Sequence, residues 1–182
     1  MKNYEKLFLQ LNPLKNYEKL YLAANLLIDI SEETQRIHTN QKKLLSPTSW
    51  AKEFCTVKFC VSRATGHTGC IQKLIDRRFK KKVILFLNNQ LAITNFTNMW
   101  GLPHDDIWKL PYNDCNFPIF TFNNIDNTYR GRDYSSLEAI IVDTSTYSMS
   151  KKNEDLLYKN IYPSILPQFH YKNKPFFFIF VQ

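Results

Sequence analysis

The sequence has few glycines, few cysteines and no long apolar run, and each shortage excludes a class of protein. Only four glycines occur among 182 residues, 15% of which are aromatic, so we expect most of the chain to fold. The four cysteines form no Cys-x-x-Cys pair, and no histidine pair stands at zinc spacing, which favours buried free thiols in a reducing compartment over a zinc site. The longest apolar run, 175–181, is far shorter than the roughly 20 residues that span a bilayer.

Residues 1–20 are interrupted by Lys, Glu and Asn, so we expect no signal peptide and a cytoplasmic protein that does not enter a membrane. The formal net charge of +8 favours an acidic partner such as nucleic acid or a nucleotide, although charge also serves solubility. The basic run 77–82 is the sharpest local patch. Because cations are favourable at helix C-termini, we interpret it as a solvated helix end.

Residues 57–79 have the order strand, turn, helix. Apolar residues alternate over 57–61, and after Gly69 they recur at the spacing of a helix with one buried face. The turn between them holds two of the four glycines. Unpaired N–H groups and the helix dipole favour an anion at such a helix start. The alternative is an ordinary turn in which Gly66 serves only its own backbone angles.

The turn partly matches the phosphate-loop pattern Gly-x-x-x-x-Gly-Lys-Ser/Thr. Gly66 and Thr68 occupy the last glycine and the hydroxyl, whereas Val61 stands at the first glycine. His67 replaces the lysine, and a neutral histidine lacks the permanent charge that lysine places on phosphates. Arg63, at the start of the loop, is the candidate for that charge because its guanidinium can hold phosphate with two parallel hydrogen bonds.

The chain divides into an N-terminal helical segment, 1–49, and an α/β domain, 50–182. Pro13 separates a short helix from a longer one at 17–30, and the polar stretch 31–43 is either a third helix or a mobile arm. The N-terminal helices either pack on the core, which we favour, or bind a partner. Further strands are predicted at 82–88, 117–123, 137–143 and 176–181, and further helices at 50–54, 92–100 and 151–166.

Strand 137–143 ends in Asp143. In P-loop enzymes an aspartate at the end of a buried strand reaches Mg²⁺, directly or through water. The alternative is an aspartate that caps the following segment.

The loop Ser62-Arg63-Ala64-Thr65-Gly66-His67-Thr68 resembles the deviant P-loop of large terminase subunits, the DNA-packaging motors of tailed phages and herpesviruses. Many of those loops begin Ser-Arg and continue to Gly-Lys-Thr. The pair Arg130-Gly131, ahead of the strand that ends in Asp143, is similar to the Arg-Gly pair that precedes the Walker B strand of that family. The resemblance covers residues 50–181 and implies a P-loop NTPase fold of the RecA-like kind, a mostly parallel sheet with helices on both faces.

The resemblance also implies a function: a viral, nucleotide-binding, ATPase-like protein that works on or near DNA, with ATP and Mg²⁺ as cofactors. It makes Arg63 and Asp143 the catalytic candidates and Thr68 and Asp143 the metal ligands. The implied nucleotide-binding residues are Ser62, Arg63, Ala64, Thr65, Gly66, His67, Thr68 and Gly69. Other implied partners are DNA, further viral proteins or copies of the same chain, in the host cytoplasm.

The sequence departs from the family at the two positions most tied to hydrolysis. His67 replaces the lysine, and Thr144 stands where the family has a glutamate that activates water, so Glu138 and Asp133 become the candidate substitute bases. The sequence ends at Gln182, where the family continues into a coupling motif and a nuclease domain. Two hypotheses follow: an ATP hydrolase, or a degenerate P-loop fold that acts as a DNA- or protein-binding module. A nucleotide kinase is less favoured because no Arg-rich lid is evident.

Overall fold

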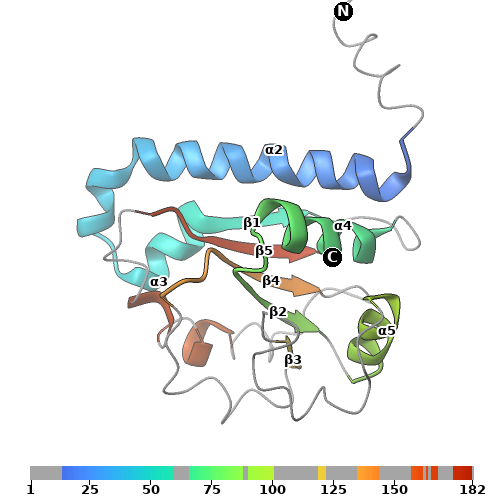
Figure 1. The fold of residues 1–182 in the computed structure, drawn as a ribbon. Helices are drawn as coiled ribbons and strands as arrows, with labels where there is room; N and C mark the ends of the chain where they lie inside the picture. The colour runs from blue at the N-terminus through green and yellow to red at the C-terminus, as the bar shows by residue number, and fades with distance from the viewer. Residues whose placement is uncertain are drawn as a thin grey trace, which may run out of the picture.

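The centre of the molecule is a five-stranded sheet in the order β1-β5-β4-β2-β3, in which every pairing is parallel (Figure 1). The computed structural model describes residues 14–59, 66–87, 90–100, 119–121, 135–143, 157–161, 163, 165–167 and 174–181. The strands are β1 Thr56–Phe59, β2 Val83–Leu87, β3 Ile119–Thr121, β4 Ala139–Asp143 and β5 Phe177–Val181. The five predicted strands therefore share one sheet, and the predicted α/β class is confirmed.

Helices surround this sheet. They are α2 Asn16–Ile37, α3 Pro47–Trp50, α4 His67–Lys73 and α5 Gln90–Trp100, together with the 3₁₀ helix η1 Thr39–Lys43 and the π-helical turns η2 Ala51–Cys55, η3 Leu74–Arg78 and η6 Leu157–Ile161. The stretch 31–43 extends α2 and then forms η1, so the longer helix ends later than 30. The predicted helix before Pro13 and the first part of the one at 151–166 lie outside the described residues. No helix within the described ranges is long and apolar enough to cross a membrane.

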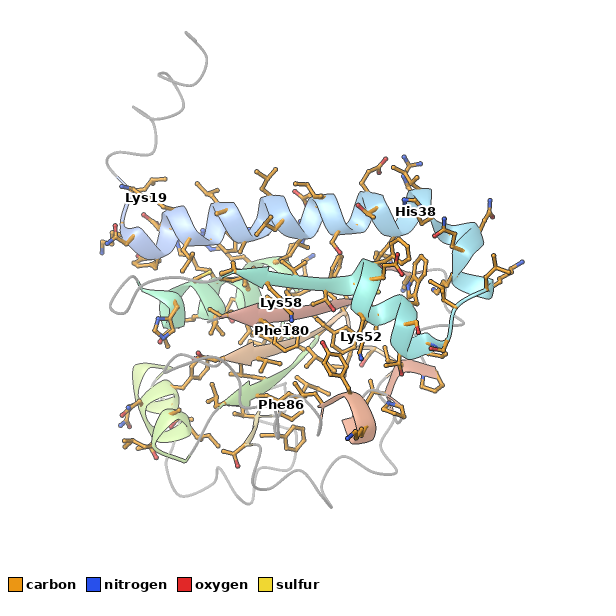
Figure 2. The ribbon with its side chains drawn as sticks, turned by 180° about the vertical axis from the view of Figure 1, so that it is seen from behind. Lys19, His38, Lys52, Lys58, Phe86 and Phe180 are labelled. Carbon is orange, nitrogen blue, oxygen red and sulfur yellow. The ribbon has the colours of Figure 1, made fainter. Side chains whose placement is uncertain are left out.

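The central strands β2, β4 and β5 are buried on both faces, and their side chains alternate between two cores. One face packs against α3, η2 and η6; its strand residues are Ile84, Phe86, Phe120, Ile140, Val142, Phe178 and Phe180. The other face packs against α2, α4, η3 and α5; its strand residues are Val57, Val83, Leu85, Leu87, Ala139, Ile141, Phe177, Ile179 and Val181. On the edge strand β1, the exposed Lys58 lies 5.2 Å from the centroid of the Phe180 ring (Figure 2). Each face is therefore covered by helices.

Helix α2 runs antiparallel to the strands beside β1 (Figure 1). Buried polar side chains fix its C-terminal half. The Ser31 hydroxyl donates to the Phe54 carbonyl at 2.8 Å. The Gln35 amide donates to the Phe176 carbonyl at 3.1 Å and accepts from the Phe176 N–H at 3.3 Å. These contacts explain why the helix continues past 30 through a polar sequence: its polar residues hydrogen-bond buried backbone instead of solvent.

The basic run 77–82 is a solvated helix end only in part. Arg77, Lys80 and Lys82 are exposed. The guanidinium of Arg78 instead holds η3 to α2, at 2.7 Å from Asp29 and 3.1 Å from Glu32. Part of the positive charge of this run therefore serves packing and is not available to a partner.

The strand order creates a switch point in the sheet. The connections from β1 to β2 and from β2 to β3 lead toward the β3 edge, with α4 and α5 on one face. The connection from β4 leads the opposite way, to β5, with η6 on the other face. The connections of β4 and β2 therefore diverge at their carboxyl ends, and ligands of open α/β sheets bind at such a point.

We predict that Gln35→Ala lowers the free energy of unfolding by about 2 kcal/mol, because it removes two buried hydrogen bonds to the Phe176 backbone, worth about 1 kcal/mol each. Urea denaturation followed by circular dichroism measures the change. The matched control is Gln41→Ala, whose side chain is exposed on η1. Equal stability of the two variants would contradict the role assigned to Gln35.

Candidate functional site

The carboxyl ends of the strands form one row across the sheet. The registers align Phe59 with Val181, Val181 with Asp143, and Asp143 with Leu87. Asp143 is only 5% exposed. Because side chains alternate along β4 and Ile141 belongs to the core under α2 and α4, Asp143 points to that same face. The carboxylate predicted from the sequence thus lies at the switch point, on the face that α4 covers.

Helix α4 begins at this edge, after the loop that leaves β1. Gly66 is its N-cap, with a left-handed backbone at φ 86° and ψ 26°. The Cys70 N–H donates to the Gly66 carbonyl at 3.0 Å, so it closes the first turn. The N–H groups of His67, Thr68 and Gly69 precede that bond and have no acceptor within the helix. These four half-buried residues, 66–69, are the part of the predicted phosphate loop that the structure describes.

Tyr17, in the first turn of α2, lies directly on this helix start. A Cβ atom on Gly66 would be 2.8 Å from Tyr17 Cβ and 3.1 Å from the Tyr17 backbone nitrogen. A Cβ atom on Gly69 would be 3.2 Å from Tyr17 Cβ. Both glycines therefore permit a close approach of α2. Gly66 also provides the left-handed backbone angles of the turn. The loop sequence carries no signal for this contact, because nothing in its pattern points to α2.

An ion pair holds the same contact. Lys73 Nζ lies 2.9 Å from Glu18 Oε1 and 4.7 Å from the centroid of the Tyr17 ring. The hydrogen bond from Lys73 lowers the pKa of the Glu18 carboxyl below its ordinary value. The stabilisation that this pair contributes is therefore present above the ordinary pKa of a glutamate and is lost as the pH falls through the lowered value.

A hollow of about 640 Å³ lies beside the start of α4, a volume within the range of small-molecule sites. Its lining consists of Tyr17, the helix start 66–69 and, from the next two turns, Gln72, Lys73, Asp76 and Arg77, whereas Asp143 is not part of it. The lining thus brings two cations, Lys73 and Arg77, and one carboxylate, Asp76, close to a helix N-terminus that favours an anion.

The two residues predicted to hold Mg²⁺ carry oxygen ligands of the kinds that this ion takes. Thr68 offers a hydroxyl and Asp143 a carboxylate, and Mg²⁺ in phosphate sites takes one or two such oxygens beside phosphate and water. Because β5 separates β1 from β4, the ends of the two strands are about 10 Å apart, which is two strand spacings. A ligand that touches both would lie across the end of β5. The described residues contain no group of three or more His, Cys, Asp or Glu side chains suited to a metal without such a ligand.

Glu138, a candidate substitute for the missing glutamate, is at the wrong end of the sheet. It precedes β4 at the amino edge, where its Oε1 lies 2.7 Å from Lys82 Nζ. Asp143 lies at the other end of β4, roughly 16 Å away at the rise of a strand. Glu138 therefore cannot activate water beside Asp143. The other candidate base, Asp133, lies outside the described residues, as do 62–65, Arg130, Gly131 and Thr144.

Two cysteines confirm the prediction of buried free thiols. Cys55 and Cys70 are free and buried, and burial raises the pKa of each thiol to about 12. Both therefore remain protonated and unreactive near neutral pH. Cys60 and Cys115 lie outside the described residues.

The chain matches no protein-family model, no curated protein and no solved structure. The resemblance to terminases therefore remains a prediction from the loop and strand motifs, and the function is argued below from the geometry of this chain.

We predict that Gly66→Ala lowers the free energy of unfolding by about 2 kcal/mol or more, because a left-handed backbone costs a non-glycine residue 1–2 kcal/mol and the new Cβ meets Tyr17. Gly69→Ala is the matched control. There, alanine gains up to about 1 kcal/mol of helix propensity, which offsets its tight contact with the Tyr17 side chain. Urea denaturation of both variants provides the comparison, and equal losses would contradict this account of Gly66.

Proposed function

We propose that this chain binds a nucleoside triphosphate with Mg²⁺ at the carboxyl edge of its sheet, as a P-loop, ATPase-like protein of the DNA-packaging kind. One observation carries the proposal: a left-handed glycine opens α4 at the edge where Asp143 ends β4, on the face that α4 covers. A phosphate chain across the end of β5 would reach both.

Each residue has a role in this proposal. The N–H groups of His67, Thr68 and Gly69, aided by the helix dipole, would hold phosphate oxygens. Arg63 would add the charge that His67 does not supply. Thr68 and Asp143 would hold Mg²⁺, which when bound neutralises charge on the phosphates. The net charge of +8 and the terminase-like motifs support DNA as the polymer on which the protein acts.

The second candidate is a module that binds nucleotide, DNA or protein without turnover. The position of Glu138 favours it, because that residue is paired with Lys82 at the amino edge and cannot replace the missing glutamate. His67 and Thr144 stand at the two positions that hydrolysis requires in the terminase family that the loop resembles. Binding and hydrolysis therefore need separate experiments.

Titration calorimetry with ATP·Mg²⁺ tests binding. We predict that Arg63→Ala weakens the affinity about tenfold or more, because charge-assisted hydrogen bonds contribute about 1.5–3 kcal/mol. His67→Lys should strengthen it, because lysine adds a permanent charge at the helix start. Lys43→Ala, which removes an exposed cation on η1, is the control for non-specific charge. Absence of binding to the wild-type chain at millimolar nucleotide would end the proposal.

A phosphate-release assay separates the two candidates. For an ATPase, we predict steady release that Asp143→Asn abolishes without loss of the folded structure. For a non-hydrolysing module, we predict nucleotide binding with no release above the buffer rate. The combined variant His67→Lys, Thr144→Glu restores both replaced residues, so release by this variant alone would assign the wild-type chain to the module.

A further inference from the structure

The side of α2 that faces away from the sheet carries an apolar stripe. The helix buries Ala24 and Ile28 against the core. On its opposite side it exposes Leu22 at 47%, Leu26 at 61%, Ile30 at 54% and Ile37 at 63%. Spacings of four and seven residues align these side chains along one face of the helix. We call these four residues the outer stripe.

The outer stripe is a concentration of exposed apolar surface. It holds four of the seven large apolar side chains that are exposed in the described part of the chain. Single exposed apolar residues are ordinary, whereas a contiguous set marks an interaction surface. In both figures α2 forms the outermost layer on the β1 side of the sheet, and no other described element lies beyond it.

Charges on the same face are arranged symmetrically about Leu26. Leu22 and Ile30 stand four residues before and after it, and Lys19 and Glu33 stand seven residues before and after it. Seven residues are about two helical turns, so both charges lie on the side of the outer stripe. Figure 2 shows Lys19 near the start of α2, outside the core. The face is therefore positive toward its N-terminal end and negative toward its C-terminal end.

We propose that a second copy of this chain covers Leu22, Leu26 and Ile30 of the outer stripe, with the two α2 helices antiparallel about a two-fold axis at Leu26. In this arrangement Leu22 contacts Ile30 of the partner subunit, and Lys19 contacts Glu33 of the partner subunit. Because of the two-fold axis, each of these contacts occurs twice in the dimer. A parallel arrangement would instead set Lys19 against Lys19 of the partner subunit. The self-complementary order of charges thus selects both the partner and the orientation.

The dimer is expected to be weak. One helix-on-helix contact is smaller than the roughly 800 Å² per partner of a standard interface, so we expect micromolar dissociation. Glu33 also pairs with Arg36 of its own helix, but this pair is exposed, with side chains 74% and 53% accessible for Arg36 and Glu33. The carboxylate therefore remains accessible to a second cation.

Sedimentation equilibrium on the full chain and on two charge variants tests the pairing. Lys19→Glu and Glu33→Lys each replace two attractive pairs by two repulsive ones, so each variant alone should dimerise about tenfold more weakly than the wild type. A mixture of the two variants restores both attractive pairs in the heterodimer. Recovery of dimer in the mixture is the expected result, and no recovery overturns the antiparallel arrangement.

Two apolar variants complete the test. Leu26→Glu places two carboxylates together on the axis and should yield a monomer. Leu91→Glu, at another leucine with 67% exposure, on α5, should leave the dimer intact. Both side chains are exposed, so circular dichroism should show an unchanged fold. A monomeric wild-type chain at about 1 mM, well above the expected micromolar dissociation, overturns the proposal, as does a dimer that survives Leu26→Glu. If residues 1–13 of the same chain covered the outer stripe, the wild-type chain would stay monomeric, which is the first of these two overturning results.

Discussion

A parallel sheet whose central strands are buried on both sides must be covered on both faces, and this requirement organises the molecule. The chain leaves β1 at the carboxyl edge and crosses one face as α4 before it enters β2. The start of α4 must therefore lie at the carboxyl edge, beside the ends of the other strands. The turn at Gly66 and the end of β4 at Asp143 come together for this reason, although the sequence separates them widely. The candidate site is a consequence of how the sheet is covered.

Helix α2 connects the two edges of the sheet. At the amino edge Gln35 hydrogen-bonds the backbone before β5, and at the carboxyl edge Tyr17 packs on Gly66 and Gly69. The ion pair between Glu18 and Lys73 holds the second contact. One side of α2 therefore fixes the start of α4, while the opposite side presents the outer stripe. A partner on that stripe would be joined to the site by a single rigid helix.

Local patterns were sufficient to predict the strands, the α/β class and an aspartate at a strand end. They were not sufficient for the order of the strands, because an apolar run such as 176–181 does not specify its neighbours, and β5 separates β1 from β4. Apolar periodicity also predicts an end of α2 that is too early. Ser31 and Gln35 are polar, yet they are buried in the helix, where they hydrogen-bond to backbone groups. Tyr17 was missed at the site because its contact with Gly66 depends on tertiary packing. Glu138 was wrongly considered as a base, because its pairing with Lys82 at the amino edge appears only in the structure.

In the function proposed above, the start of α4 and the end of β4 form one anion site. Amide NMR spectra of the ¹⁵N-labelled chain, recorded while ATP·Mg²⁺ is added, test it most directly. We predict that the amides of His67, Thr68, Gly69 and Asp143 shift together, with one common affinity. Shifts confined to another region, such as the hollow of about 330 Å³ beside Arg36, Lys42 and Lys174, would contradict it if the amides of 67–69 stayed unchanged.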